Sequence, residues 1–105
     1  FDPADIAASF QKAVVEVLVE NSMKAVEDYG IYKFAIAGGV ASNTALRGTM
    51  EQVCEEKGVK FYHPSPVYCT DNAAMIGAAA FYEYLAGTRH GWDLNAVPNL
   101  KLGDR

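Results

Sequence analysis

The feature that most constrains the fold is a short apolar segment, Tyr32–Ala37, that ends at two consecutive glycines, Gly38 and Gly39. A run of this length stopped by glycine is typical of a buried strand that ends in a tight turn. A second short strand is predicted at Val59–Tyr62, and the loop beginning at His63-Pro64 ends it, because proline cannot donate to a ladder. The sequence therefore predicts two strands that each lead into a loop.

Stretches with helical spacing surround these strands. The first is predicted to begin at Pro3, with Asp2 as its N-cap, and to end at Gly30, which suits a left-handed C-cap. Its apolar residues recur near helical spacing and predict one buried stripe. The expected members of that stripe are Ile6, Phe10, Val14, Val17, Leu18 and Val26.

Two further helices are predicted after the glycine turn. One starts near Ser42 and stops at Gly58, and the other is capped by Thr70 or Asp71 and ends at Gly87. The inner face of the earlier of these two helices is expected to hold Leu46, Met50, Val53 and Cys54. Residues 88–105 have asparagine, proline and glycine punctuation and no period, so we expect an extended tail there.

The order helix–strand–helix–strand–helix predicts an α/β chain with a short parallel sheet, because a β-α-β connection is parallel and right-handed. Two strands are too few for a free-standing parallel sheet, which needs more strands and cover on both faces. The chain also begins with Phe1 rather than methionine. We therefore expect a piece of a larger α/β domain, with a lobe over residues 1–87 and an extended tail over residues 88–105.

Composition argues against several classes of function. Half of the residues are hydrophobic, as in a globular protein, and the net charge of −4 at pH 7 argues against a surface that grips nucleic acid phosphates. Cys54 and Cys69 form no CxxC pair and fit free thiols in a reducing cytosol. No apolar run approaches the length of a membrane span. We expect a cytoplasmic protein that does not engage a membrane.

The segment Ala37–Asn43 is the first candidate site. Ligands in open α/β sheets bind at the carboxyl ends of strands, where Gly38 and Gly39 would let the backbone approach a ligand. Asn43 adds an amide that can donate to a nucleotide and accept from it. Ser42 or Asn43 could equally cap the helix after a plain turn, and spacing alone leaves the two interpretations even. The loop matches neither a Walker A loop nor a GxGxxG fingerprint.

The segment Tyr68–Asn72 is the second candidate site. An acid such as Asp71 at a helix start most often only caps the helix, at about 0.3–1 kcal/mol. The alternative is an oxygen ligand for a metal, which needs further ligands from elsewhere. We interpret Cys69 as a small buried filler rather than a reactive thiol, and His63 and His90 as surface residues. No Ser/His/Asp set, paired carboxylates or HExxH helix supports peptidase chemistry.

Three segments, taken in order, resemble the TsaD family, whose older name is O-sialoglycoprotein endopeptidase or glycoprotease. They are Asp5–Gln11, Ala37–Asn43 with Leu46-Arg47, and Cys69–Ile76. The tail Asp93–Gly103 is similar to family endings as well. The resemblance covers nearly the whole chain and corresponds to the C-terminal third of the family. It implies part of a ribonuclease-H-like lobe of the actin, hexokinase and Hsp70 ATPase-like fold, in which two lobes enclose a ligand cleft.

The resemblance implies a transferase that moves a threonylcarbamoyl group from threonylcarbamoyl-AMP to the exocyclic nitrogen of the adenosine beside the tRNA anticodon. By motif, Gly38 and Gly39 would approach the adenylate, Asn43 would contact it, and Asp71 would be one ligand of a bound iron or zinc. That metal could polarise the threonylcarbamoyl group as a Lewis acid. The family's other metal ligands, two histidines four apart on a helix of the N-terminal lobe, are absent from this chain. We therefore assign no catalytic residue here and expect the chain alone to be inactive.

The resemblance also implies a TsaB-like partner subunit and a TsaE-like ATPase, with few contacts to this segment.

One alternative is the nucleotide-binding lobe of a sugar or acyl kinase of the same fold, which would fit the glycine turn but needs no metal ligand at Asp71. Another is a non-catalytic interaction module. A missing lobe would expose a sheet edge and an apolar face, so we expect the chain to self-associate. Peptidase activity ranks last.

Overall fold

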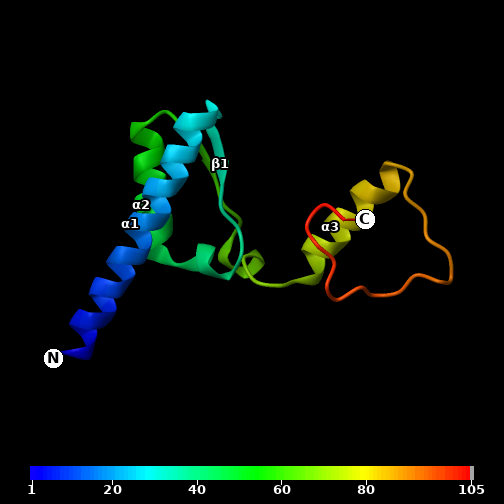
Figure 1. The fold of residues 1–105 in the computed structure, drawn as a ribbon, viewed down its shortest axis with the longest axis horizontal. Coiled ribbons are helices and arrows are strands. Elements are labelled where there is room, and N and C mark those ends of the chain that lie inside the picture. Colours follow the sequence, from blue (N-terminus) through cyan, green and yellow to red (C-terminus); the bar gives the residue numbers. More distant parts are fainter. Residues whose placement is uncertain (105) are drawn as a thin grey trace. The chain divides into compact units, whose positions relative to one another are not determined.

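The computed structural model describes residues 1–104, which form two compact units, one over residues 1–72 and one that starts at Ala73. The elements of the first unit are α1 (Pro3–Tyr29), β1 (Lys33–Ala35), η1 (Gly39–Ser42), α2 (Thr44–Glu56), β2 (Lys60–Tyr62) and η2 (Pro66–Tyr68). The second unit contains α3 (Ala73–Leu85) (Figure 1). The predicted α/β class and element order are confirmed. The predicted division at residue 87 concerns membership of a larger domain and stays a prediction.

Both ends of α1 are set by residues that the sequence marks. The Asp2 Oδ1 accepts a hydrogen bond from the Ala4 N–H at 2.9 Å, and Pro3 occupies the first turn, where its missing N–H is harmless. Gly30 ends the helix in the left-handed region at φ 64°, a conformation that glycine adopts without steric cost. The predicted boundaries of this helix are therefore confirmed.

The buried face of α1 differs from the predicted stripe. Of the six predicted residues only Val26 is buried, and it is joined by Val15, Val19 and Met23. The exposed members are Ile6, Phe10, Val14, Val17 and Leu18. Periodicity shows that α1 is amphipathic, but this helix is apolar over a wide arc, and the position of α2 decides which part of the arc is covered. The predicted stripe is therefore wrong for this chain.

The remaining core of residues 1–72 comes from α2 and the start of β2. The predicted inner residues Leu46, Met50 and Cys54 are buried, and Val53 is half-buried against them. The complete buried cluster consists of Val15, Val19, Met23, Val26, Leu46, Met50, Cys54 and Val59. The helices α1 and α2 lie side by side, with β1 beside them (Figure 1).

The two strands form a parallel pair, as predicted, but they are shorter than the predicted segments. Phe34 pairs with Phe61 in the register, and their stacked rings pack on the helical core with centroids 6.4 Å apart. The flanking residues of both strands, such as Lys33 and Ala35, are exposed. The prediction of a buried strand was therefore wrong, because within residues 1–72 the helical core covers only the phenylalanine face of the sheet.

The unit that starts at Ala73 has a different character. None of the residues of α3 is buried, although the helix consists almost entirely of apolar residues. Its last turn ends before Gly87, whose φ of 90° suits glycine, and residues 88–104 contain turns but no helix or strand. No helix formed by residues 1–104 is both long and apolar enough to cross a membrane.

Candidate functional site

Two loops leave the same edge of the sheet and define the candidate site. Because β1 and β2 are parallel, their carboxyl ends lie at one edge, and β1 leads into residues 36–43 while β2 leads into residues 63–72. The Ile36 N–H donates to the Tyr62 carbonyl at 3.1 Å, so the ladder continues to the point where the loops diverge. This is the edge where open α/β sheets bind ligands.

The glycine turn has a backbone that requires glycine at one of its two positions. Gly38 has a φ of 90°, in the region that disfavours side chains, whereas Gly39 begins η1 with an ordinary φ. The turn is closed by the Ala41 N–H, which donates to the Gly38 carbonyl at 3.0 Å, and by the Ser42 hydroxyl, which donates to the Gly39 carbonyl at 2.6 Å. Both glycines are exposed, so their backbone is accessible to a ligand.

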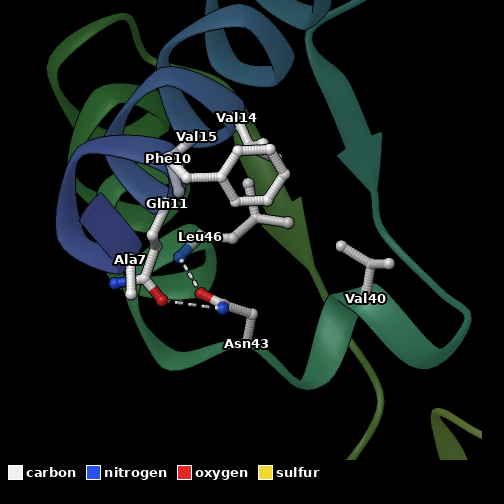
Figure 2. Close-up of a pocket in the computed structure, with 8 residues that line it drawn as sticks. All are labelled: Ala7, Phe10, Gln11, Val14, Val15, Val40, Asn43 and Leu46. Carbon is white, nitrogen blue, oxygen red and sulfur yellow. Dashed lines mark hydrogen bonds between the residues drawn. The ribbon is translucent and has the colours of Figure 1, made fainter. Parts of the chain in front are cut away.

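Asn43 is held by hydrogen bonds at both ends of its amide (Figure 2). Its Oδ1 accepts from the Leu46 N–H at 2.9 Å, which makes Asn43 the N-cap of α2. Its Nδ2 donates to the Gln11 Oε1 at 3.1 Å, across 32 residues of sequence. The capping interpretation is thus confirmed, and contact with a nucleotide stays a prediction. Sequence reasoning missed Gln11, since nothing local signals a partner so far along the chain.

An apolar hollow opens beside this amide pair. It measures about 300 Å³ and lies between α1, η1 and the start of α2, with the Phe10 ring and Val40 on opposite sides (Figure 2). Its lining consists of Ala7, Phe10, Gln11, Val14, Val15, Val40, Asn43 and Leu46. A second hollow of about 500 Å³ shares Val14, Val40 and Leu46 and extends along β1. Several residues of the exposed α1 stripe line these hollows.

The second loop is stabilised by its own backbone and by a buried thiol. Cys69 is buried, as predicted, with its Sγ 3.7 Å from the Ser65 carbonyl oxygen. The Asn72 Nδ2 donates to the Thr70 carbonyl at 2.9 Å. Because α3 begins at Ala73, the position directly before the helix belongs to Asn72, so the cap predicted at Thr70 or Asp71 was misplaced. Shifts of one or two residues are usual at helix ends.

The structure brings the two predicted motifs together. A methyl group added at Gly39 would lie 4.0 Å from the Thr70 Cγ2, which is ordinary van der Waals contact. Thr70 is the residue before Asp71, whose own side chain is exposed. The glycine turn and the start of the Asp71 segment therefore meet at one edge of the sheet, as strand order alone predicts for loops that follow neighbouring parallel strands.

The described residues do not form a complete metal site. Within residues 1–104 there is no group of three or more His, Cys, Asp or Glu side chains that could hold a metal ion. Asp71 can supply carboxylate oxygens, but one residue does not satisfy the coordination of iron or zinc. His63 and His90 are both exposed, as predicted. The role of Asp71 as a metal ligand therefore stays a prediction.

The two groups with shifted pKa values lie away from this edge. Burial raises the pKa of the Cys54 thiol, because the thiolate is less well solvated in the core. A hydrogen bond from Lys57 to the Glu27 carboxylate, assisted by the attraction of their charges, raises the pKa of Lys57. Both residues belong to the packing of α1 against α2, and neither takes part in the candidate site.

Together, the fold and the site define part of an α/β lobe in which two loops follow the carboxyl ends of neighbouring parallel strands. A sequence model of the TsaD family, tRNA N6-adenosine threonylcarbamoyltransferase, matches residues 2–78. A protein of that name from Clostridium botulinum (strain Hall) is 57% identical over 102 residues, which is 97% of this chain and 30% of the relative. Relatives of the same name from Clostridium novyi (strain NT) and Clostridium kluyveri (strain NBRC 12016) are 56% and 55% identical over the same shares.

The chain belongs to the TsaD family and spans about 30% of the length of the curated relatives it matches. This assignment confirms the resemblance to TsaD and sets aside a sugar or acyl kinase, because the name of the matching relatives specifies a threonylcarbamoyl group rather than a phosphoryl group.

Proposed function

We propose that this chain is part of an enzyme that transfers a threonylcarbamoyl group from threonylcarbamoyl-AMP to the adenosine beside the tRNA anticodon. The observation that carries the proposal is 57% identity across 97% of the chain to a protein named tRNA N6-adenosine threonylcarbamoyltransferase. The chain amounts to 30% of that relative, so the activity belongs to the longer polypeptide and the chain alone is inactive. The proposed place of action is the cytoplasm, where tRNA is modified.

In this proposal Gly38, Gly39 and Asn43 form one wall of the adenylate site. The exposed glycine backbone supports close approach of a ligand, and the Asn43 amide is already oriented by Gln11 and by the Leu46 N–H. A primary amide has two N–H groups and a carbonyl with two lone pairs, so these two bonds leave capacity for a nucleotide. An amide fixed before binding loses little side-chain entropy when the ligand arrives.

Asp71 is proposed as one ligand of iron or zinc in the longer polypeptide. Its exposed carboxylate and its place next to Thr70, which a methyl group added at Gly39 would meet at 4.0 Å, support this role. Since residues 1–104 do not complete a metal site, the remaining ligands are assigned to the part of the family protein outside this chain. A TsaB-like subunit and a TsaE-like ATPase are proposed as partners of the longer polypeptide, with their main contacts on that other part.

The test is a chimera in which this chain replaces the matching segment of the Clostridium botulinum relative. The chimera, supplied with its partner proteins and threonylcarbamoyl-AMP, should modify tRNA to a level near that of the parent, measured by mass spectrometry of digested nucleosides. Asp71→Ala should lower metal content and product together, and Asn43→Ala should weaken nucleotide binding. His90→Ala, in the exposed tail, is the matched control and should change neither quantity.

Two outcomes would overturn the proposal. One is a chimera that folds and is soluble but leaves tRNA unmodified under conditions where the parent is active. The other is an Asp71→Ala chimera that retains both its metal and its full activity, which would remove Asp71 from the site. Measurable transfer by this chain alone would contradict the assignment of the activity to the longer polypeptide.

A further inference from the structure

Arg47 occupies a position that links the two loops of the candidate site. It lies on α2 one turn after Asn43, and its N–H donates to the Asn43 carbonyl at 3.0 Å. Its half-buried side chain reaches the other loop, where the guanidinium Nη2 lies 2.6 Å from the His63 Nδ1 and 3.5 Å from the Pro64 carbonyl oxygen. The start of α2 is therefore connected to both loops. Asn43 joins it to residues 36–43, and Arg47 joins it to the loop that begins at His63.

The Arg47 contact fixes the tautomer of His63. A guanidinium has only donors and stays protonated, so the His63 Nδ1 must accept and the ring proton must lie on Nε2. The Nδ1 also lies 3.1 Å from the Pro64 carbonyl, but that contact would require Nδ1 to donate. The Nδ1 cannot accept from Arg47 and donate to the Pro64 carbonyl at the same time. We assign the hydrogen bond to Arg47, because that contact is shorter and the guanidinium can only donate. The His63 ring also lies against Phe61 of β2, with centroids 5.5 Å apart, which anchors it to the sheet.

The residues that Arg47 contacts continue directly into the second motif. The Pro64 carbonyl, which faces Arg47, also lies 4.0 Å from the Cys69 Sγ. The Tyr68 N–H donates to the Ser65 carbonyl at 2.9 Å, and the Cys69 N–H donates to the Pro66 carbonyl at 3.2 Å. These bonds close residues 64–69 into one compact turn. A side chain that holds the start of this turn therefore also limits the movement of the residues that follow it.

We propose that Arg47 is a positioning residue that holds the loop after β2 against α2, so that Thr70 and Asp71 stay beside the Gly38–Gly39 turn. The inference rests on the proposed function for the role of Asp71, whereas the loop geometry stands by itself. Arg47 touches none of the reacting groups in this proposal. It acts through His63 and the turn that follows, and α2 becomes the element that sets the relative position of both halves of the site.

The first experiment uses this chain alone and does not depend on activity. Nitrogen-15 NMR of labelled histidine should show His63 protonated on Nε2 and unprotonated on Nδ1. Hydrogen exchange of the backbone amides of residues 67–70 should rise about tenfold in Arg47→Ala, while the amides of Met50 and Cys54 keep their protection. Lys12→Ala removes an exposed cation on α1 and is the matched control. A proton on Nδ1, or unchanged loop exchange in a folded Arg47→Ala chain, would overturn the proposal.

Arg47→Lys and His63→Ala test the same positioning role if Arg47→Ala does not fold. Arg47→Lys retains the charge but lacks the planar fork, so it should give exchange between that of the wild type and that of Arg47→Ala. His63→Ala removes an exposed side chain and should reproduce most of the rise, and adding Arg47→Ala to it should add little. If the increases in amide exchange caused by Arg47→Ala and His63→Ala simply added in the double variant, Arg47 would not act on the loop through His63.

The second experiment measures the chimera described above. Arg47→Ala should lower metal content and product formation about tenfold without a matching loss of thermal stability, and Arg47→Lys should recover part of both. If the chimera is inactive but the His63 tautomer and the loop exchange behave as expected, the transferase assignment fails and the positioning of the loop stands. If the chimera is active and Arg47→Ala leaves metal and product unchanged, the role of Arg47 in the site is overturned.

Discussion

The two compact units of the chain show that burial depends on available partners more than on how apolar a helix is. Within residues 1–72, α2 is amphipathic and buries Leu46, Met50 and Cys54 against α1. From Ala73 onward, α3 is much more apolar than α2, yet none of its residues is buried. A helix that is hydrophobic around most of its circumference is normally found in the core of a larger protein. This pattern fits a chain that spans about 30% of its relatives.

The largest expected effect concerns association, because it is all or none. We expect the chain to self-associate through α3, whose exposed apolar side chains are Met75, Ile76, Phe81, Tyr82, Tyr84 and Leu85. A chain that ends at Asn72 lacks this surface and should associate more weakly, although it keeps the exposed apolar residues of α1. Sedimentation velocity over a wide range of concentrations measures both. A monomeric full chain at every concentration would contradict the prediction, and a shortened chain that associates as strongly as the full chain would move the surface to residues 1–72.

The next effect compares one substitution in each unit. Met50→Ala removes a side chain that is 1% exposed and should destabilise residues 1–72 by about 2–5 kcal/mol, a large fraction of the stability of a small domain. Ile76→Ala removes a side chain that is 63% exposed and should change the same transition by less than about 0.5 kcal/mol. Urea unfolding followed by circular dichroism gives both values. Similar losses for the two variants would show that α3 shares the core of residues 1–72.

The elements of residues 1–72 were largely predictable because their signals are local. Asp2 and Gly30 mark the ends of α1 through cap chemistry, and the glycine turn marks the end of β1. The buried positions of α2 follow from its single narrow apolar face. In α1 the same logic was wrong, because an apolar arc wider than one partner leaves residues such as Phe10 exposed. The period shows that a face exists, and only the neighbouring element selects the part that is buried.

The candidate site was predictable residue by residue but not as a structure. Gly38, Gly39 and Asn43 could be named from the turn, yet the bond from Asn43 to Gln11 joins residues 32 positions apart and has no local signature. The proximity of Thr70 to Gly39 follows in outline from parallel strand order, but its distance does not. The predicted ligand Asp71 belongs to no group of three or more His, Cys, Asp or Glu side chains within residues 1–104, so the metal site that the resemblance implies stays a prediction.

A glycine with the same positive φ can be substituted in each of the two units. Gly38 and Gly87 both have a φ of 90°, and a methyl group added to either would meet no atom within 4 Å. Substitution by alanine is therefore disfavoured at both positions by backbone conformation alone, by about 1 kcal/mol. Gly38→Ala should lower the stability of residues 1–72 by this amount, whereas Gly87→Ala should leave that transition unchanged. A loss in both variants would indicate that the two units unfold together.

The smallest expected effect is the pH dependence of a surface bond that joins α1 to the end of α2. The Lys57 Nζ lies 2.5 Å from the Glu27 Oε1, and this hydrogen bond raises the pKa of Lys57 above its ordinary value. A raised lysine pKa stabilises the fold below the unfolded value of about 10.4, and the gain disappears as pH rises through the folded value. The pair is exposed and screened by salt, so the contribution is small.

Glu27→Gln should therefore be less stable than the wild type at about pH 8. The difference should shrink as pH rises from about 10.4, where the unfolded chain loses the Lys57 proton, through the raised pKa at which the folded chain loses it. Burial raises the pKa of Cys54 as well, so both proteins should lose stability as pH rises through that range, and this common loss cancels in the comparison. Asp28→Gln is the matched control, because Asp28 binds Lys24 within α1 and joins no second element. Urea midpoints at the two pH values, repeated in high salt, give the measurement. A difference between wild type and Glu27→Gln that persists undiminished above pH 10.4 would show that Glu27 stabilises the packing of α1 through contacts other than its bond to Lys57.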